Sequence, residues 1–221
     1  MTTYDFKDGK GPVPAHQHPN GGGWVADTAT VEAIAFVGPD AQVYGYAQVY
    51  GYARVYDNAQ VSDNAFVSDN AQVSDNARLY GNARVYGYAL VYGNARVSSY
   101  ARVSGNARVY GNVIVSDNAQ VFGNASVSGD AIVSGNAQVY GDAQVYGDAR
   151  VSKTLVQVRR SDCYDFILVP CSDGKDRIIA GCRYFTLEKA YNHWNKEHPK
   201  HKETIVILES LKKLYEMQKS S

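Results

Sequence analysis

The sequence predicts a mainly β protein in which short strands stack as a parallel solenoid, followed by a small domain of strands and helices. Three observations support this fold class. Valine recurs at every sixth residue over 21 steps from Val25 to Val151, and Leu79 is the one replacement in that series. The composition changes after the last repeat, because no lysine occurs between Lys10 and Lys153. The segment before the first repeat has no hydrophobic period and is rich in Gly and Pro.

Each hexad has the pattern of a short strand and a corner, as in AQVYGD at residues 137–142. Its first four positions alternate as in a strand, with Ala and Val on one side. Its last two are turn residues, because Gly accepts a positive φ, and Asn or Asp tolerates the left-handed region. A four-residue strand cannot bury its inward Val and Ala alone. Successive hexads must therefore stack on one another.

This hexad resembles the hexapeptide repeat of left-handed parallel β-helices, in which three hexads form one triangular coil. The resemblance implies the left hand and a helix of about seven triangular coils. Residues 18 apart would then lie one above the other on three faces. The first face begins with inward Val25, the second with Val31 and the third with Val37. On each face, the next inward Val or Leu lies 18 residues further along the chain.

A wider resemblance covers essentially the whole chain. GPVPAHQHPNGGGWVADTATV near the start, the A-x-V-x-G-N ladder, and RIIAGCRYFTLEKAYNHW near the end are together similar to bacterial and prophage-encoded hexapeptide-repeat proteins. It implies a phage- or prophage-encoded protein in the cytoplasm of a bacterial host cell, and it carries over no catalytic residues.

The flanks divide the chain into three segments. Residues 1–24 are expected to be an extended N-terminal cap, residues 25–152 the β-helix, and residues 153–221 an α+β cap on the last coil. Within the cap, the patterns predict three strands and two helices, the first capped by Thr186. The strands are expected at 154–160, 165–171 and 177–185, and the helices at 187–198 and 203–218.

The middle of the β-helix is basic and aromatic. No acidic residue lies between Asp75 and Asp117, whereas acids recur on either side of this stretch. We call its five arginines the basic waist: Arg78, Arg84, Arg96, Arg102 and Arg108. Tyrosines that include Tyr86, Tyr92 and Tyr110 project among them.

The basic waist has three possible interpretations: a ligand site, a subunit interface, or a solvated surface without a binding function. Guanidinium groups bind phosphate or carboxylate and stack on aromatic rings, so the waist could hold an anionic, nucleotide-like small molecule. The residues expected to carry that site are Arg84, Arg102, Arg108, Tyr86, Tyr92 and Tyr110. Arg and Tyr are also enriched in the centres of protein interfaces, so the waist could join subunits. Outward Ile114 and Ile132 form a packing patch for the C-terminal domain or a neighbouring subunit.

Composition excludes several classes of function. The formal net charge of zero argues against bulk binding to nucleic acid. No apolar run is long enough to span a membrane, and the start of the chain lacks the pattern of a signal peptide. Three cysteines, Cys163, Cys171 and Cys182, form no metal-binding spacing and suit a reducing compartment. We expect a cytoplasmic protein with no metal and no cofactor.

Catalysis is the third hypothesis. In hexapeptide-repeat acyltransferases, as the resemblance implies, a histidine base lies by a loop or cleft between trimer subunits. Residues 25–151 contain no histidine, no lysine and no insertion, so a base would have to come from His193, His198 or His201. We therefore expect a non-enzymatic, self-associating scaffold, with a trimer favoured and no catalytic residues. Sequestration of an anionic small molecule is the first alternative, and acyl transfer is the second.

Overall fold

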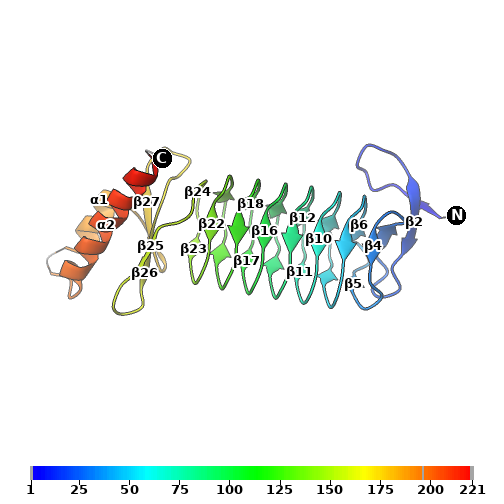
Figure 1. Ribbon diagram of the computed structural model, residues 1–221, viewed down its shortest axis with the longest axis horizontal. Coiled ribbons are helices and arrows are strands. Elements are labelled where there is room, and N and C mark those ends of the chain that lie inside the picture. The colour runs from blue at the N-terminus through cyan, green and yellow to red at the C-terminus, as the bar shows by residue number, and fades with distance from the viewer. Residues whose placement is uncertain (1, 196, 220–221) are drawn as a thin grey trace.

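The computed structural model describes residues 2–195 and 197–219, and it has an elongated shape (Figure 1). A β-solenoid forms the middle. Two strands extend it at the N-terminal end, and an α+β domain closes the C-terminal end (Figure 1). The predicted fold class is confirmed.

Three parallel sheets form the faces of the solenoid. The first face consists of β3 (Trp24–Ala26), β6 (Gln42–Val43), β9 (Gln60–Val61), β12 (Arg78–Leu79), β15 (Arg96–Val97), β18 (Ile114–Val115), β21 (Ile132–Val133) and β24 (Arg150–Val151). The second consists of β4 (Thr30–Val31), β7 (Gln48–Val49), β10 (Phe66–Val67), β13 (Arg84–Val85), β16 (Arg102–Val103), β19 (Gln120–Val121) and β22 (Gln138–Val139). The third consists of β5 (Phe36–Val37), β8 (Arg54–Val55), β11 (Gln72–Val73), β14 (Leu90–Val91), β17 (Arg108–Val109), β20 (Ser126–Val127) and β23 (Gln144–Val145).

The register follows the predicted 18-residue coil. Arg78 pairs with Arg96, and the same step joins the other neighbouring strands of each face. The expected four-residue strand is too long, since each strand spans only two residues in most coils. The reason is the corner: the N–H of an inward Ala closes a turn onto the carbonyl three residues earlier, as between Ala65 and Ser62 at 3.1 Å.

The core of the solenoid is a thin column of Val and Ala. Inward Val and Ala side chains from Val37 to Val145 are almost completely buried. This column continues into the C-terminal sheet through Ile167, Val169 and Ile179. Burial of many small side chains in ranks supplies the hydrophobic driving force that no single hexad has.

The corners explain four of the acids that flank the waist. Asp63, Asp69, Asp75 and Asp117 have positive φ at positions that Gly occupies in other coils. Each carboxylate accepts a hydrogen bond from the backbone N–H of a glycine 18 residues later, as from Gly81 to Asp63 at 3.0 Å. Asp can therefore replace Gly because its side chain offsets part of the cost of the left-handed conformation.

The N-terminal segment is more ordered than a plain extended cap. Strands β1 (Thr3–Tyr4) and β2 (Val13–Gln17) pair antiparallel and continue the first face through β3. The ring of Tyr4 stacks on Trp24 at 4.4 Å, and buried Phe6 stacks on Tyr44 at 4.9 Å. We call residues 5–12 the N-terminal loop. It turns back toward the solenoid (Figure 1).

The C-terminal domain is a four-stranded antiparallel sheet under two helices. Its strands are β25 (Gln157–Arg159), β26 (Asp165–Val169), β27 (Arg177–Ala180) and β28 (Arg183–Thr186), and its helices are α1 (Leu187–His193) and α2 (His201–Lys219). The single strand expected at 177–185 is a hairpin, because Gly181 turns the chain with a φ of 55°. Thr186 caps α1 as predicted, but α1 ends at His193, short of the expected 198. Lys196 lies outside the described residues.

The two faces of this sheet have different partners. Ile167, Val169 and Ile179 face the solenoid core, whereas Phe166, Leu168 and Ile178 pack with the helices. This alternation lets one sheet close the solenoid and also form the floor of a second core. Among the described residues, no helix has the length and apolar character needed to cross a membrane.

Candidate functional site

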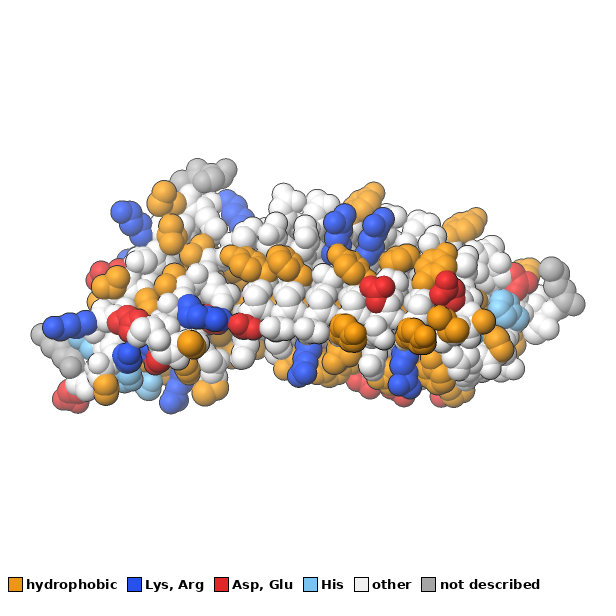
Figure 2. Space-filling model, turned by 60° about the horizontal axis from the view of Figure 1, so that its bottom comes forward, with side chains coloured by type: hydrophobic (Ala, Val, Ile, Leu, Met, Phe, Trp, Pro, Cys, Tyr) orange, Lys and Arg blue, Asp and Glu red, His pale blue; other side chains and the backbone are white. Residues whose placement is uncertain are grey.

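The basic waist encircles the solenoid. Arg78 and Arg96 lie on the first face, Arg84 and Arg102 on the second, and Arg108 on the third. All five side chains are exposed. Figure 2 shows Lys and Arg side chains that project from the middle of the solenoid at both edges of the view, with hydrophobic side chains beside them.

These five arginines have no ion pair or side-chain hydrogen bond within the part of the chain that the structure describes. By contrast, Arg159, Arg160 and Arg177 form ion pairs with carboxylates. Arg54 makes a cation–π contact, with its guanidinium carbon 5.1 Å from the centre of the Phe36 ring. Like charges directly opposite on neighbouring strands destabilise a sheet. The waist thus keeps two in-register arginine pairs that lack a counter-charge.

The second face also has aromatic edges. Four tyrosines of the solenoid are more than 60% exposed, and all four lie at the two corners that bound this face. Tyr46 and Tyr100 follow strands of the first face, with exposed fractions of 67% and 63%. Tyr52 and Tyr88 follow strands of the second face, with exposed fractions of 69% and 65%. Sequence reasoning grouped tyrosines by their nearness to the arginines and so missed this arrangement, although the hexad positions contain it.

Two shallow hollows lie on the second face. One, of about 430 Å³, is lined by Gln48, Asn64, Phe66, Asn82 and Arg84. The other, of about 230 Å³, shares Phe66 and Arg84 and adds Ser68, Tyr86 and Arg102. No carboxylate lines either hollow. Both hollows are thus aromatic and basic without a carboxylate in their lining.

The six residues proposed for an anionic ligand are not brought together in one hollow of the described chain. Arg84, Arg102 and Tyr86 share the smaller hollow of the second face. Tyr92 and Tyr110 stack in parallel at 4.9 Å at the corner after the third face, which carries Arg108. Burial and the neighbouring Tyr110 raise the pKa of Tyr92. An 18-residue coil rotates successive hexads to different faces, so nearness in sequence does not produce one cluster.

The two residues of the expected packing patch form a stack on the first face. Ile114 and Ile132 pair in register and are half-buried. The C-terminal domain closes the end of the solenoid and does not lie over the patch (Figure 1). Coverage by a neighbouring subunit stays a prediction.

Polar contacts that no sequence pattern predicts join the C-terminal domain to the last coil. The Tyr184 hydroxyl donates to Asp148 at 2.7 Å and lies 2.8 Å from the Cys171 sulfur, and the Ser172 hydroxyl also donates to Asp148. These bonds lower the pKa of Asp148 to about 2, with the bond from Ser172 as the largest cause. Burial, and then the contact with Cys171, raises the pKa of Tyr184.

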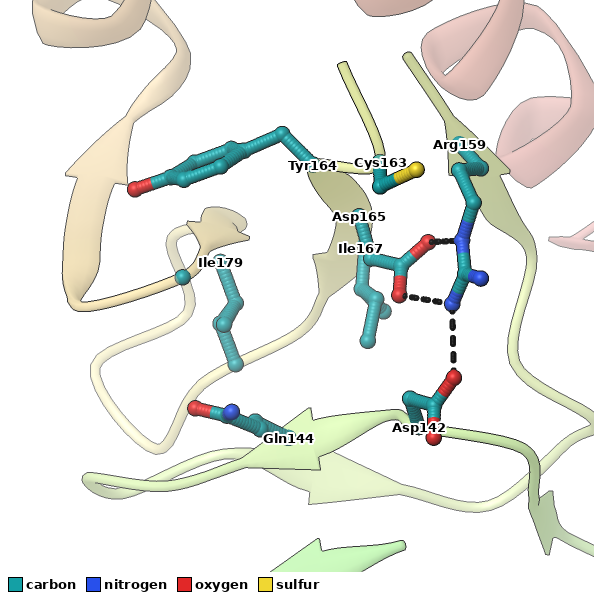
Figure 3. Close-up of a pocket in the computed structure, with 9 residues that line it drawn as sticks. Asp142, Gln144, Arg159, Cys163, Tyr164, Asp165, Ile167 and Ile179 are labelled. Atoms are coloured by element: carbon teal, nitrogen blue, oxygen red, sulfur yellow. Dashed lines mark hydrogen bonds and ion pairs between the residues drawn. The ribbon is translucent and has the colours of Figure 1, made fainter. Parts of the chain in front are cut away.

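A second contact lines a hollow of about 350 Å³ at the same junction (Figure 3). The Arg159 guanidinium bonds Asp165 and bridges to Asp142 of the solenoid at 2.8 Å (Figure 3). The hydrogen bonds that Arg159 donates to Asp165 are the largest cause of the raised pKa of Arg159. Because both carboxylates already bind Arg159, this hollow serves docking of the domain more directly than ligand binding.

The C-terminal histidines lie on the helix side of the sheet. His193 contacts the rings of Phe185 and Trp194, and burial lowers its pKa. His201 Nδ1 lies 2.8 Å from the Trp194 carbonyl. The sheet therefore separates these rings from the solenoid faces (Figure 1). The described residues contain no group of three or more His, Cys, Asp or Glu that could hold a metal ion.

Comparison with known proteins supports the repeat architecture. The model of the YdcK beta solenoid repeat matches residues 47–62, 59–75, 77–93, 101–117, 119–135, 127–141 and 143–153. No curated protein matches the chain. Among solved structures, the acetyltransferase domain of PglB from Neisseria gonorrhoeae FA1090, in complex with acetyl coenzyme A, is similar at 17% identity with a TM-score of 0.41. The match covers 55% of this chain and 54% of the PglB domain. This chain therefore spans about half the length of the structure that it matches. The chain is a hexapeptide-repeat β-helix protein whose repeats match the YdcK beta solenoid repeat.

Proposed function

We propose that this protein is an assembly module in which two copies pair through their second faces, with the solenoid axes antiparallel. The observation that carries the proposal is a symmetric pattern around Phe66. QVYGY at residues 48–52 and RVYGY at residues 84–88 lie one coil to either side of FVSDN at residues 66–70. A surface with this symmetry can meet itself across a two-fold axis.

A two-fold axis along the strand direction at Phe66 matches the aromatic side chains of two copies. Phe66 then lies opposite Phe66 of the second copy, and Tyr52 lies opposite Tyr88 at one edge. The same rotation brings Tyr50 opposite Tyr86. Stacked or edge-on aromatic pairs add stability to an interface beyond their buried area. The proposed dimer would cover Tyr52 and Tyr88, which explains why both side chains are exposed in the single chain.

The positions of the arginines favour the antiparallel arrangement over a parallel one. In the antiparallel pair, Arg84 lies opposite Gln48, and Arg102 lies opposite Thr30, next to Glu32. A parallel pair, or a parallel trimer that used this face, would bring each arginine close to the same arginine of the neighbouring copy. Like charges that meet in an interface are costly. The trimer expected from the sequence is therefore a less suitable use of the second face.

The size of the contact predicts a reversible dimer. Five ranks of the face overlap, which is roughly 400 Å² of projected area per copy at strand spacings of about 4.8 Å. This is below the roughly 800 Å² per partner of a standard stable interface, so we expect a dissociation constant on the order of tens of micromolar.

The same geometry supports the proposal of assembly over that of acyl transfer. The faces are uniform two-residue strands, and residues 25–151 hold no histidine or lysine. The histidines of the C-terminal domain lie across its sheet from the solenoid. A general base would need to reach a substrate on a solenoid face directly or through one water.

Sedimentation velocity over a concentration series tests the proposal. The wild-type chain should shift from monomer to dimer as its concentration rises through the tens of micromolar. The double variant Tyr52→Ser and Tyr88→Ser should weaken the dimer by about tenfold, because both edge pairs are lost. Tyr140→Ser is the matched control, since Tyr140 also borders the second face but lies outside the overlap.

Three outcomes would count against the proposal. One is a monomer at every concentration, and a second is a trimer. The third is equal weakening by Tyr140→Ser, which would mean that tyrosines stabilise the assembly without the proposed register.

A further inference from the structure

We propose that a groove between the N-terminal loop and the first face binds a phosphate ester of a small molecule, with the phosphoryl group held between Arg78 and Arg96. This site is separate from the dimer surface. It has a volume of about 370 Å³, and the residues that line it are Asp8, Lys10, Tyr44, Gln60, Ser62, Asp63, Arg78, Leu79, Tyr80 and Arg96. We call it the loop groove.

The two arginines provide the anion site. Arg78 and Arg96 pair in register on β12 and β15, and both are exposed. Strands of one sheet are about 4.8 Å apart, so two guanidinium groups that extend from this pair can grip one tetrahedral anion from two sides. Neither has a carboxylate partner among the described residues. An anion between them would remove their mutual repulsion.

The N-terminal loop makes this pair different from Arg84 and Arg102. Phe6 is 4% exposed and stacks on Tyr44, which fixes one end of the loop against the first face. Gln42 donates to the Tyr4 hydroxyl at 3.3 Å at the same end. The loop thus provides a wall with Lys10, whereas the second face is open on the side of its arginines.

The remaining lining favours an ester over free phosphate. Tyr80 is 37% exposed and presents a ring beside the arginines, and Gln60 and Ser62 supply neutral polar groups. Asp63 accepts from the Gly81 N–H, and Asp8 binds the Lys10 side chain at 3.4 Å, so both acids have partners. These carboxylates oppose a ligand charged along its whole length. They suit one with an anionic end and a neutral or aromatic remainder.

Calorimetric titration at fixed ionic strength tests the site, with phenyl phosphate and inorganic phosphate as probes. Phenyl phosphate should bind saturably and more tightly than inorganic phosphate. The double variant Arg78→Gln and Arg96→Gln should weaken binding of phenyl phosphate at least tenfold. Arg84→Gln with Arg102→Gln is the matched control, since that pair has the same register without the loop, and it should change binding less than twofold.

A conservative variant separates bidentate binding from charge alone. Arg78→Lys with Arg96→Lys keeps both charges but loses the guanidinium fork, so it should still weaken binding severalfold. Circular dichroism of each variant checks that the solenoid is intact. Equal losses in the two glutamine variants, or no saturable binding by the wild-type chain, would overturn the inference. Neither result bears on the dimer, because the loop groove is on the first face.

Discussion

Tyr184 of the C-terminal sheet and Asp148 of the last coil are joined by a hydrogen bond of 2.7 Å from the tyrosine hydroxyl to the carboxylate. Around this bond, Ser172 donates to the same carboxylate and the Cys171 thiol contacts the hydroxyl. Cys171 also pairs with Ala149 as an isolated antiparallel bridge. The junction thus combines a short backbone pairing with a polar network beside the apolar contact of Ile167 and Val169.

Acid should loosen this junction. The pKa of Asp148 in the folded chain is lowered to about 2, so its bonds contribute stability above about pH 4 and lose it as the pH falls toward 2. After allowance for solvent screening, we expect a loss of about 1 kcal/mol. Urea unfolding of the C-terminal domain, followed by Trp194 fluorescence in a Trp24→Phe background, measures the effect.

Asp148→Asn should remove much of that pH dependence, since the titrating group is gone. Asp130→Asn is the matched control because Asp130 lies one coil earlier at the same corner and accepts from Asn112. If Asp148→Asn left the acid dependence unchanged, the network would not control docking of the domain.

The corner at Asp63 gives a second prediction. Asp63 has a φ of 58°, and its carboxylate accepts from the Gly81 N–H. Asp63→Ala loses the bond and keeps the conformational cost, so it should lower the free energy of unfolding by about 2 kcal/mol. Asp63→Gly loses the bond but relieves that cost, and it should destabilise less. Chemical denaturation of the two variants tests the order, and a more stable alanine variant would contradict it.

Charge exchange probes the register of the proposed dimer. In that register Arg102 of one copy lies near Glu32 of the other, so Arg102→Glu should weaken association by about tenfold. Adding Glu32→Arg should restore part of the loss. Arg108→Glu on the third face should have little effect. Sedimentation velocity reports all three variants, and a double variant no tighter than Arg102→Glu would argue against this register.

Much of the solenoid could be predicted because the repeat length is constant. The face and the coil of each residue therefore follow from its number in the sequence. Once 18 residues form a coil, the pairs Arg78–Arg96, Arg84–Arg102 and Ile114–Ile132 follow by addition, and all three are present. The same counting places Tyr52 and Tyr88 at one corner of the second face. Grouping the tyrosines by region does not reveal this corner, whereas grouping them by hexad position does.

The flanks could not be predicted in this way, because they lack a period. The run at 177–185 contains a hairpin whose only local signal is Gly181. The contact of Tyr184 with Asp148 depends on how two independent units meet, and no spacing in the sequence encodes it. The N-terminal loop is likewise placed by long-range contacts, such as that between Phe6 and Tyr44.

Thiol cross-linking at the centre of the second face tests the antiparallel assembly most directly. The exposed Cys163 and Cys182 are first changed to Ser, and buried Cys171 is kept. Phe66→Cys then places one thiol at the proposed two-fold axis, and Gln120→Cys places one three ranks away on the same face. We predict that a short bismaleimide joins two chains efficiently at position 66 and poorly at position 120, where the thiols would be roughly 29 Å apart along the axis. Equal cross-linking at both positions, or none at position 66, would contradict the proposed dimer.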